Sequence, residues 1–229
     1  GHAGAVYLDG MHDHDLATVV VNESWFANNS ALAASALYSA RARLMLSNTS
    51  FHANSSQSGS ALSVGSGRLW ISHASFLGNS ALSPSYAADL IVETGYTTIE
   101  RVANTVFART GAGPNCSPMM IDVQSGDAVF ASSACYFYNP DNELLTSEFP
   151  GSDFGLVPAQ ILGRIPALHP APGSALIDNG SNALCAPWDV RGLTRPIDGD
   201  GNGHATCDIG AVEYDPDIIF ADGLDFAPG

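Results

Sequence analysis

Three stretches of the chain repeat one pattern at intervals of 25 residues: Val21-Asn-Glu-Ser-Trp-Phe-Ala-Asn-Asn-Ser-Ala-Leu32, Leu46-Ser-Asn-Thr-Ser-Phe-His-Ala-Asn-Ser-Ser-Gln57 and Ile71-Ser-His-Ala-Ser-Phe-Leu-Gly-Asn-Ser-Ala-Leu82. In each stretch Phe follows the first aliphatic residue by five positions, and Asn follows Phe by three. Strict periodicity of this length is typical of repeat architectures, in which similar units stack on one another. The pattern therefore predicts a stack of repeating units.

Each repeat contains about three short runs with the character of strands, separated by turns. Examples from one repeat are Ser35-Ala-Leu-Tyr38 and Arg43-Leu-Met-Leu46. Strands that return in the same orientation every 25 residues cannot be hairpins, because a hairpin reverses direction. Parallel pairing of successive repeats, about 4.8 Å apart, satisfies the period. We therefore expect an all-β fold, a parallel β-helix or solenoid.

The stacked positions acquire physical roles in such a fold. Alternation along a strand places one aliphatic set on the inner face, namely Val19, Val21, Leu44, Leu46, Leu69 and Ile71. An internal aromatic column follows, made of Phe26, Phe51 and Phe76, and then a turn with Asn29, Asn54 and Asn79. Asn tolerates left-handed backbone and can bond to backbone or to a stacked Asn.

The fourth repeat departs from the pattern. Phe107 stands 31 residues after Phe76, Thr110 replaces Asn, and Glu100 occupies the position of Leu44 and Leu69. Burying an unpaired carboxylate costs several kcal/mol. We therefore expect a β-bulge that turns Glu100 outward.

The composition describes a turn-rich chain of negative charge. Of 229 residues, 45% are hydrophobic and 14% charged, with 23 Gly and 13 Pro, which is typical of β-rich proteins. All 8 basic residues are Arg and the formal net charge is −15, which disfavours nucleic acid and anionic membrane surfaces. Cations, neutral sugars and basic partners fit better. No apolar run approaches the ~20 residues of a membrane span, and the start has no signal peptide, so we expect a soluble chain.

The four cysteines fall into two local pairs, Cys116 with Cys135 and Cys185 with Cys207. An even count at such spacing permits two disulfides, although the sequence leaves the other pairings and four buried thiols open. Disulfides favour an oxidising compartment such as a periplasm or the cell exterior.

The first residues, Gly1-His-Ala-Gly-Ala-Val-Tyr-Leu8, resemble the later runs in the middle of a repeat. The first coil of a solenoid otherwise exposes its core and a row of unpaired backbone groups. We therefore expect preceding β-helix coils, of the same precursor or of another chain, as partners at an open N-terminal end.

The repeat is lost from about residue 140, where Pro becomes frequent. We expect β-helix coils of about 25–31 residues over 1–140, and an irregular, Pro/Gly-rich cap over 141–229 packed on the last coils. Within the cap, short strands are expected at Ala175-Leu-Ile-Asp178 and from Asp208 to Tyr214.

Three cap segments carry a specific resemblance: Pro172-Gly-Ser-Ala-Leu-Ile-Asp-Asn-Gly180, Asp189-Val-Arg-Gly-Leu-Thr-Arg-Pro196 and Asp208-Ile-Gly-Ala-Val-Glu213. They resemble the C-terminal signature of bacterial right-handed parallel β-helix proteins of the choice-of-anchor Q type. The Phe-x-x-Asn-Ser repeats are similar to those of polymorphic outer-membrane proteins. The tail from Ile219 to Asp225 is similar to an ending found on secreted proteins of gammaproteobacteria, with Leu224 and Asp225 departing from it. The resemblance implies a right-handed solenoid and secretion, but no activity.

A candidate Ca²⁺ loop lies at Asp198-Gly-Asp-Gly-Asn-Gly-His204. Oxygen side chains at alternate positions, with Gly between them, open a Ca²⁺-binding loop. The expected ligands are Asp198, Asp200 and Asn202, completed by Asp208 or Glu213. The alternative is a tight Asp/Gly turn without an ion.

A second polar cluster combines His12 and His14 with Asp9. The two histidines can reach one metal ion, with carboxylates as further ligands. Because no third ligand is identified elsewhere in the sequence, a solvated turn is the favoured interpretation. His52 and His73 stand alone and are interpreted as surface or turn residues.

A saccharide site is expected on the outward turns and faces of the coils. Trp25 and Trp70 alternate with inward residues and can stack on sugar rings, unless a neighbouring loop covers them. The candidate ligand-binding residues are Trp25, Trp70, Arg43, Arg68, Asp9, His12 and His14.

These patterns favour a secreted or cell-surface bacterial β-helix module that is structural, adhesive or carbohydrate-binding. The second hypothesis is a fragment of a polysaccharide lyase or glycoside hydrolase, but glycosidase chemistry needs two carboxylates about 5–10 Å apart, and no motif singles out a pair. No catalytic residue is predicted. A third hypothesis is one part of a longer solenoid whose preceding coils hold the function.

Overall fold

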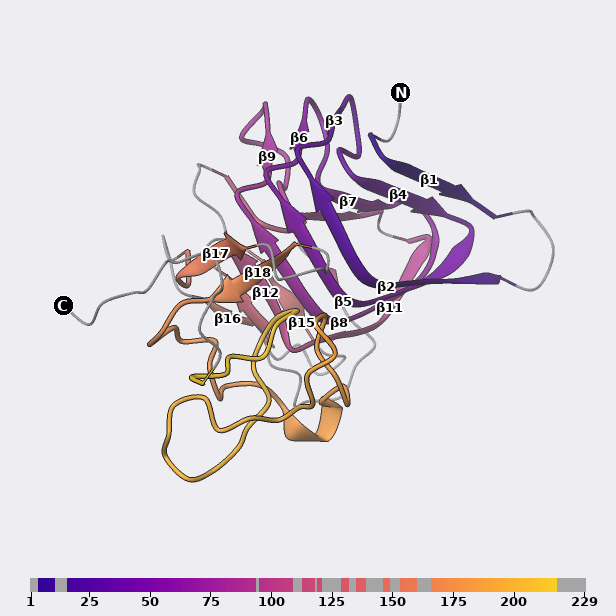
Figure 1. The fold of residues 1–229 in the computed structure, drawn as a ribbon. Helices are drawn as coiled ribbons and strands as arrows, with labels where there is room; N and C mark the ends of the chain where they lie inside the picture. Colours follow the sequence, from indigo (N-terminus) through magenta and orange to yellow (C-terminus); the bar gives the residue numbers. More distant parts are fainter. Residues whose placement is uncertain are drawn as a thin grey trace.

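The structure, a computed structural model, describes residues 4–10, 16–93, 95–108, 113–117, 119–120, 129–131, 135–138, 146–148, 153–159 and 166–217. These residues form an all-β protein whose one helical element is a short 3-10 turn, η1 (Asn182–Leu184). Its principal strands pair in parallel and stack side by side (Figure 1). The predicted all-β class is confirmed.

Three parallel sheets run through the repeats. The first holds β1 (Val6–Asp9), β4 (Leu37–Ala40), β7 (Leu62–Val64) and β10 (Leu90–Val92). The second holds β2 (Ala17–Ala27), β5 (Ala42–His52), β8 (Gly67–Leu77), β11 (Thr97–Ala103), β12 (Thr105–Ala108), β14 (Val129–Ala131) and β16 (Thr146–Glu148). The third holds β3 (Ser30–Ala31), β6 (Ser55–Ser56) and β9 (Ser80–Ala81).

The register of these sheets follows the repeat of the sequence. Val21 pairs with Leu46 and Leu46 with Ile71, while Phe26, Phe51 and Phe76 pair in the same way. Each sheet therefore takes one strand from each successive repeat, which is compatible with a parallel β-helix. β16 continues the parallel pairing of β14 beyond the predicted boundary at residue 140.

Each long strand changes direction at one residue in its middle. Glu23, Asn48 and His73 have left-handed φ angles of 48°, 47° and 53°, and these positions are skipped in the strand pairing. Left-handed backbone is costly for a residue with a side chain and persists only where the surroundings hold it. The column of such residues divides the long strands into two faces.

The core is a stack of identical positions. Leu44, Leu46, Leu69 and Ile71 are fully buried, as the alternation predicts. The rings of the aromatic column lie parallel, with centroid separations of 5.0 Å, 4.6 Å and 4.8 Å from Phe26 through Phe51 and Phe76 to Phe107. Phe107 joins the column although its spacing is irregular, because five of the six extra residues precede β11 and the sixth is bulged out of the pairing within β11.

The three predicted turn asparagines form a ladder. Asn29 Nδ2 donates to Asn54 Oδ1, and Asn54 Nδ2 donates to Asn79 Oδ1, both at 2.9 Å. The left-handed residues at this corner are Asn28, Ala53 and Gly78, each one position earlier. The conserved spacing of Asn within the chain therefore serves the ladder and not the backbone conformation.

A buried carboxylate ends the ladder. Asn79 Nδ2 donates to Asp89 Oδ1 at 2.9 Å, and Asn115 donates to Asp89 Oδ2. Thr110, which the sequence aligns with the asparagines, lies outside the described residues. Asp89 accepts hydrogen bonds on both oxygens, so its buried charge is compensated by amide donors.

The predicted bulge in the fourth repeat is confirmed. The pairing of β11 with β8 shifts register between Ile99 and Arg101, which leaves Glu100 as the extra residue. The Glu100 side chain is only 19% exposed but pairs with Arg43 and Arg68 on the outside of the sheet. The bulge thus keeps the carboxylate out of the core.

The C-terminal segment packs along one side of the repeats (Figure 1). Its strands β17 (Leu156–Ala159) and β18 (Ala167–Pro170) pair in an antiparallel arrangement. The prediction of strands at 175–178 and 208–214 is wrong, because neither segment contains a strand and both include turns or bends. Short β13 (Met119–Met120) and β15 (Phe137–Tyr138) pair in parallel.

A second apolar cluster joins this segment to the sheet. Leu77 and Val106 of the repeats pack with Leu168, Leu176 and Ile209. Two serines on the outward face also accept backbone hydrogen bonds from it, Ser50 from Leu168 at 3.3 Å and Ser75 from Ala211 at 3.0 Å. The cap therefore covers a lateral face of several repeats.

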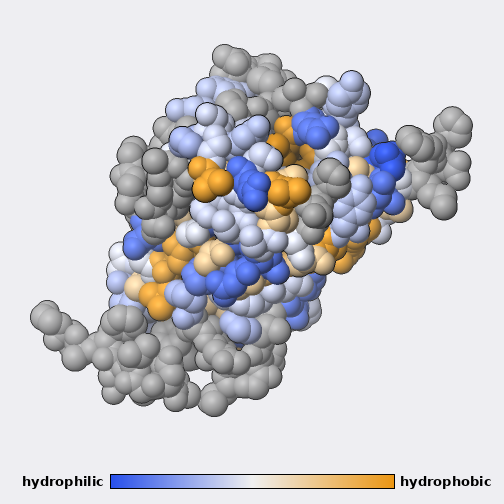
Figure 2. Space-filling view, turned by 90° about the horizontal axis from the view of Figure 1, so that it is seen from above, coloured by the Kyte–Doolittle hydropathy of each residue, from blue (hydrophilic) through white to orange (hydrophobic). Residues whose placement is uncertain are grey.

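Both local cysteine pairs are disulfides, Cys116–Cys135 and Cys185–Cys207, so the alternative pairings and the four free thiols are wrong. No helix in the described ranges is long and apolar enough to cross a membrane. Seen from above, the coloured surface is a mixture of blue, white and small orange patches (Figure 2). Large exposed hydrophobic side chains of the described residues are scattered, as for Tyr7, Val20, Leu82 and Tyr96.

Candidate functional site

The candidate site lies on the outward face of β5, β8 and β11, and we call its residues Arg43, Arg68, Trp70, Glu100 and Arg101 the arginine face. Strand register builds it. Arg43 pairs with Arg68, and Trp70 pairs with Arg101 in the next strand. Since Leu44 and Leu69 point into the core, their neighbours along the strands must point outward.

Glu100 bridges the two arginines through separate oxygens. Arg43 Nε donates to Glu100 Oε2 at 2.7 Å, and Arg68 Nη1 donates to Glu100 Oε1 at 3.2 Å. The side chains of Arg43 and Arg68 are 38% and 57% exposed. Exposed ion pairs of this kind contribute little to stability, so the cluster is available for another role.

The electrostatics of the arginine face favour anions. Partial burial raises the pKa of Glu100, but hydrogen bonds from Arg43 and Arg68 and their positive charges outweigh it, and the pKa lies below its ordinary value. Glu100 is therefore ionised near neutral pH. Two guanidinium groups against one carboxylate leave a local positive balance in a chain whose formal net charge is −15.

An apolar column runs beside the charged one. Val20 pairs with Met45 and Met45 with Trp70. Val20 is 64% exposed, and Met45 and Trp70 are partly exposed. Apolar surface beside planar guanidinium groups is the combination that binds a sugar ring carrying a carboxylate.

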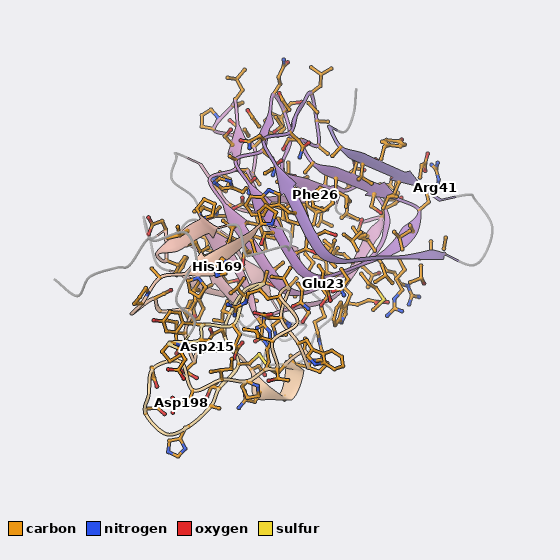
Figure 3. All side chains as sticks on the ribbon, in the orientation of Figure 1. Glu23, Phe26, Arg41, His169, Asp198 and Asp215 are labelled. Carbon is orange, nitrogen blue, oxygen red and sulfur yellow. A yellow bond between two sulfur atoms is a disulfide. The ribbon has the colours of Figure 1, made fainter. Side chains whose placement is uncertain are left out.

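The other predicted ligand residues lie elsewhere. Trp25 packs against the second apolar cluster, with its ring 5.5 Å from that of His52, so the cap covers it, as the alternative interpretation expects. Asp9 forms an ion pair with Arg41 at the edge of the first sheet (Figure 3). His12 and His14 lie outside the described residues. Among the predicted ligands, the structure therefore brings together Arg43, Arg68 and Trp70.

The Asp/Gly loop forms a second candidate site. One carboxylate oxygen each from Asp178, Asp198 and Asp200 lies within 4.8 Å of the others. Asp198 stands on the exposed loop at the lower left of Figure 3. No signal in the sequence connects Asp178 to this loop, because it lies 20 residues before Asp198 and only the folded cap brings the two together.

The remaining predicted ligands take different positions. Asn202 lies in the loop, where its Nδ2 donates to Asp200 Oδ2 at 2.9 Å. Asp208 is fully buried, and its carboxylate accepts backbone hydrogen bonds from Asp178 at 2.7 Å and Tyr214 at 2.5 Å. The buried Asp208 carboxylate therefore fixes the backbone of Asp178, while the Asp178 carboxylate lies close to those of Asp198 and Asp200.

A buried ionic cluster lies beneath this loop. Arg195 Nη1 contacts Glu213 Oε2 at 2.9 Å, and Arg191 Nε contacts Asp189 Oδ2 at 2.6 Å. Burial and the neighbouring charge of Glu213 raise the pKa of Asp208. The acidic and basic residues of the resemblance segments thus face one another, and their hydrogen bonds to backbone hold the irregular cap.

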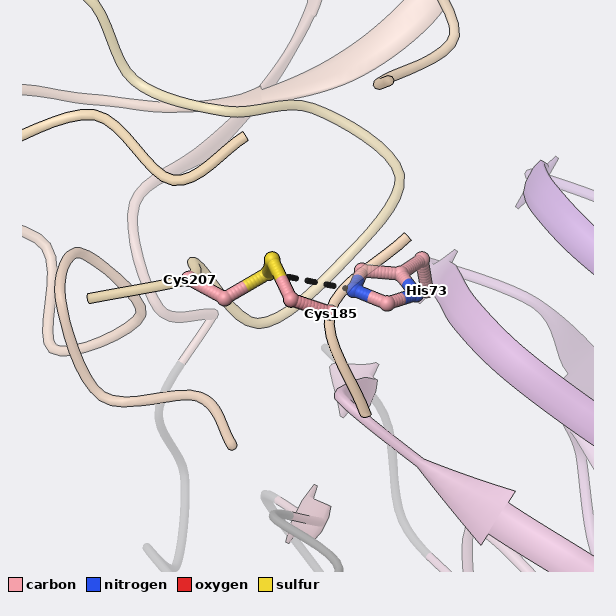
Figure 4. Close-up of side chains that lie close together, drawn as sticks. All are labelled: His73, Cys185 and Cys207. Carbon is pink, nitrogen blue, oxygen red and sulfur yellow. Dashed lines mark hydrogen bonds between the residues drawn. A yellow bond between two sulfur atoms is a disulfide. The ribbon is translucent and has the colours of Figure 1, made fainter. Parts of the chain in front are cut away.

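The prediction that His73 is a surface or turn residue is wrong. His73 lies in β8, and its fully buried side chain contacts the cap. Asn104 Nδ2 lies 3.0 Å from His73 Nε2, and His73 Nδ1 lies 2.7 Å from Ser72 Oγ. Because the amide is a donor, Nε2 accepts and Nδ1 carries the proton. Nε2 also lies 3.2 Å from Cys207 Sγ (Figure 4). The sulfurs of Cys185 and Cys207 are bonded to each other in the disulfide. The contact between His73 and Cys207 is therefore interpreted as structural.

No protein-family model, curated protein sequence or solved structure matches the chain. The functional interpretation therefore rests on the geometry of the described residues.

Proposed function

We propose that the protein is a right-handed parallel β-helix module of a bacterial cell surface or secreted protein, and that it binds acidic polysaccharide through the arginine face. The stacked parallel sheets support the solenoid. Parallel crossovers in one sheet are right-handed in nearly all known cases, which supports the handedness. The role that we propose is structural, adhesive or carbohydrate-binding. Of these, carbohydrate binding can be tested directly.

The observation that carries the proposal is the grouping of Arg43 on β5 with Arg68 and Trp70 on β8, where Arg43 pairs with Arg68 and Trp70 pairs with Arg101 of β11. Paired positions on adjacent strands lie about 4.8 Å apart. A rigid, open sheet suits a polymer that lies along the surface, because the backbone fixes the spacing of the side chains before the ligand binds.

A lyase or hydrolase remains the second candidate, but the arginine face favours binding. Strands β5, β8 and β11 contribute one carboxylate, Glu100, whereas glycosidase chemistry uses two. The lowered pKa of Glu100 makes it a weak proton acceptor near neutral pH.

Isothermal titration against polygalacturonate, with dextran as the neutral polymer, tests the proposal. Trp70→Ala and Arg68→Ala should each weaken polygalacturonate binding about tenfold, which corresponds to ~1.4 kcal/mol. Trp188→Ala is the matched control, since Trp188 is 56% exposed on the cap. If all three variants bind polygalacturonate equally well, the arginine face is not the binding site. New reducing or unsaturated ends in the mixture would establish the enzyme instead.

The extracellular location has separate support. Two disulfides are typical of oxidising compartments. The bacterial origin and the secretion rest on the resemblance to choice-of-anchor Q type solenoids.

We also propose that Asp178, Asp198, Asp200 and Asn202 bind a structural Ca²⁺ ion, because carboxylate and amide oxygens are its preferred ligands. A ligand at 100 times its Kd stabilises the folded state by about 2.7 kcal/mol. Calcium should therefore raise Tm and EGTA should lower it. Asp198→Asn should abolish the difference, whereas the exposed control Asp217→Asn should retain it. An identical Tm with calcium and with EGTA contradicts the site.

A further inference from the structure

The first repeat presents an open edge in all three parallel sheets. β1, β2 and β3 are the outermost strands of their sheets, and in the described part of the chain each pairs with a neighbour on one side only. The opposite side carries backbone N–H and C=O groups in position for another parallel strand.

The apolar side chains at this edge are those of an interior surface. Val19, Val21 and Phe26 are partly exposed. The equivalent residues one repeat later, including Leu44, Leu46 and Phe51, are fully buried. Phe26 stacks on Phe51 at 5.0 Å, and no ring of the described residues stacks on its outer face. One more repeat would bury this surface as each existing repeat buries the next.

The asparagine ladder has a direction, and it identifies what the edge recognises. Asn54 Oδ1 accepts from both the backbone N and Nδ2 of Asn29. Asn79 Oδ1 accepts the same two donors from Asn54. Asn54 Nδ2 also donates to the carbonyl of Phe26 at 2.9 Å, and Asn79 Nδ2 to that of Phe51 at 3.0 Å.

Asn29 stands at the start of this ladder with unused capacity. Its backbone N and one Nδ2 hydrogen donate to Asn54 Oδ1, while its own Oδ1 receives no donor from the described residues. By the pattern of the two repeats that follow, Oδ1 would accept from the backbone N and amide of another Asn. A Phe carbonyl three residues before that Asn would accept from Asn29 Nδ2.

We propose that this edge binds a parallel strand of a separate polypeptide segment that carries aliphatic-x-aliphatic, then Phe, then Asn three residues later. The proposal deepens the proposed function and rests on its β-helix part, but it does not depend on the arginine face. Strand addition at a sheet edge obtains affinity from backbone hydrogen bonds and specificity from alternate side chains. Here the specificity comes from the aromatic column and the ladder.

A second copy of this chain does not fit the edge. Its own Phe-x-x-Asn segments are already paired within its sheets. Two open edges related by a two-fold axis would run antiparallel, whereas the strands that carry the aromatic column and the ladder pair in parallel.

The test uses the whole protein and a fluorescent synthetic peptide with the sequence of residues 42–57, which contains β5 and β6. We expect the peptide to bind in fluorescence anisotropy and to protect the amides of β2 from hydrogen exchange. An Asn54→Leu peptide should bind at least about tenfold more weakly, because it loses the ladder hydrogen bonds. A Phe51→Ser peptide should do the same.

Equal binding by the native, Asn54→Leu and scrambled peptides would overturn the proposal. Protection of amides only outside β2 and β3, or no binding, would do the same. Concentration-dependent dimerisation in sedimentation, with no peptide binding, would assign the edge to a second copy. If the peptide binds and polygalacturonate does not, the saccharide proposal fails and this one stands. If polygalacturonate binds and the peptide does not, the strand proposal fails and the saccharide proposal stands.

Discussion

Asn54 is a buried polar residue whose amide is used completely between repeats. It accepts from Asn29 and donates to Asn79 and to the carbonyl of Phe26. A buried polar group is tolerated where each donor and acceptor finds a partner, and it becomes costly when a partner is lost. The ladder therefore makes the stacking of repeats specific in register.

Replacement of Asn54 tests this role. Asn54→Ala leaves the Phe26 carbonyl without its donor and the backbone N and Nδ2 of Asn29 without their acceptor, and we expect the free energy of unfolding to fall by about 3 kcal/mol. The control is Asn22→Ala, since the exposed Asn22 amide bonds only to the adjacent Glu23 and should change stability by less than about 0.5 kcal/mol. Urea unfolding measures both, and similar losses would show that the ladder adds no stability.

His73 gives the folded state a defined pH response. Burial, and to a smaller extent the charge of Arg195, lowers the pKa of His73 from 6.5 to about 2. Between these values the unfolded state binds one more proton than the folded state. The free energy of unfolding therefore falls as pH falls below 6.5, by about 1.4 kcal/mol per pH unit.

His73→Asn should remove this response, and Asn also tolerates the left-handed φ angle of 53° at this position. Between pH 6 and pH 4 the wild-type protein should lose about 2.5 kcal/mol more stability than the variant. The buried acids of the cap titrate in the opposite sense, but they are common to both proteins and cancel in the difference. Parallel pH profiles from urea unfolding would contradict the assignment.

At the scale of elements, stacking of equal positions makes each long strand depend on both neighbours. Among the described strands, β5 and β8 are paired on both sides, whereas β2 has one partner. Phe51 and Phe76 are accordingly fully buried and Phe26 is only partly so. The same residue type in the same column therefore stands in two environments.

These environments predict unequal effects of one substitution. Phe76→Ala should cost about 3–5 kcal/mol, because it removes a buried ring and leaves a cavity. Phe26→Ala should cost less than half as much, since part of its ring remains in water. Chemical unfolding compares the two, and equal losses would mean that the first repeat is as well packed as the third.

At the scale of the whole molecule, positive charge is used locally. The chain has 8 basic residues and 23 acidic ones. Arg41 pairs with Asp9, Arg43 and Arg68 with Glu100, Arg191 with Asp189, and Arg195 with Glu213. The resulting surface has no basic stripe among the described residues, and the arginine face is a local exception to an acidic molecule.

The disulfides act on separate parts of the molecule, because one joins Cys116 to Cys135 and the other joins two cap residues. Their sequence separations of 19 and 22 residues imply similar constraints on the unfolded chain. The double variants Cys116→Ser with Cys135→Ser, and Cys185→Ser with Cys207→Ser, should each lose about 3 kcal/mol. Guanidinium unfolding measures the losses. A difference of several kcal/mol between them would show that folded-state contacts such as His73–Cys207 dominate.

The sequence by itself determined the repeat: the parallel register, the inner aliphatic face, the aromatic column, the stacked asparagines and the outward bulge at Glu100. These features are predictable because each repeat contacts the same positions of the next, so the period of the sequence is also the period of the contacts. The short spacing of the cysteines favoured two local disulfides but left the other pairings open, and the structure decided between them.

Only the tertiary structure decided how the cap meets the repeats. It buried His73, covered Trp25, brought Asp178 to Asp198 and Asp200, and placed Asp89 at the end of the ladder. These contacts join unlike segments, often more than 100 residues apart, as between Ser75 and Ala211. No periodic spacing connects such partners, because their proximity results from the packing of an irregular chain on a regular one.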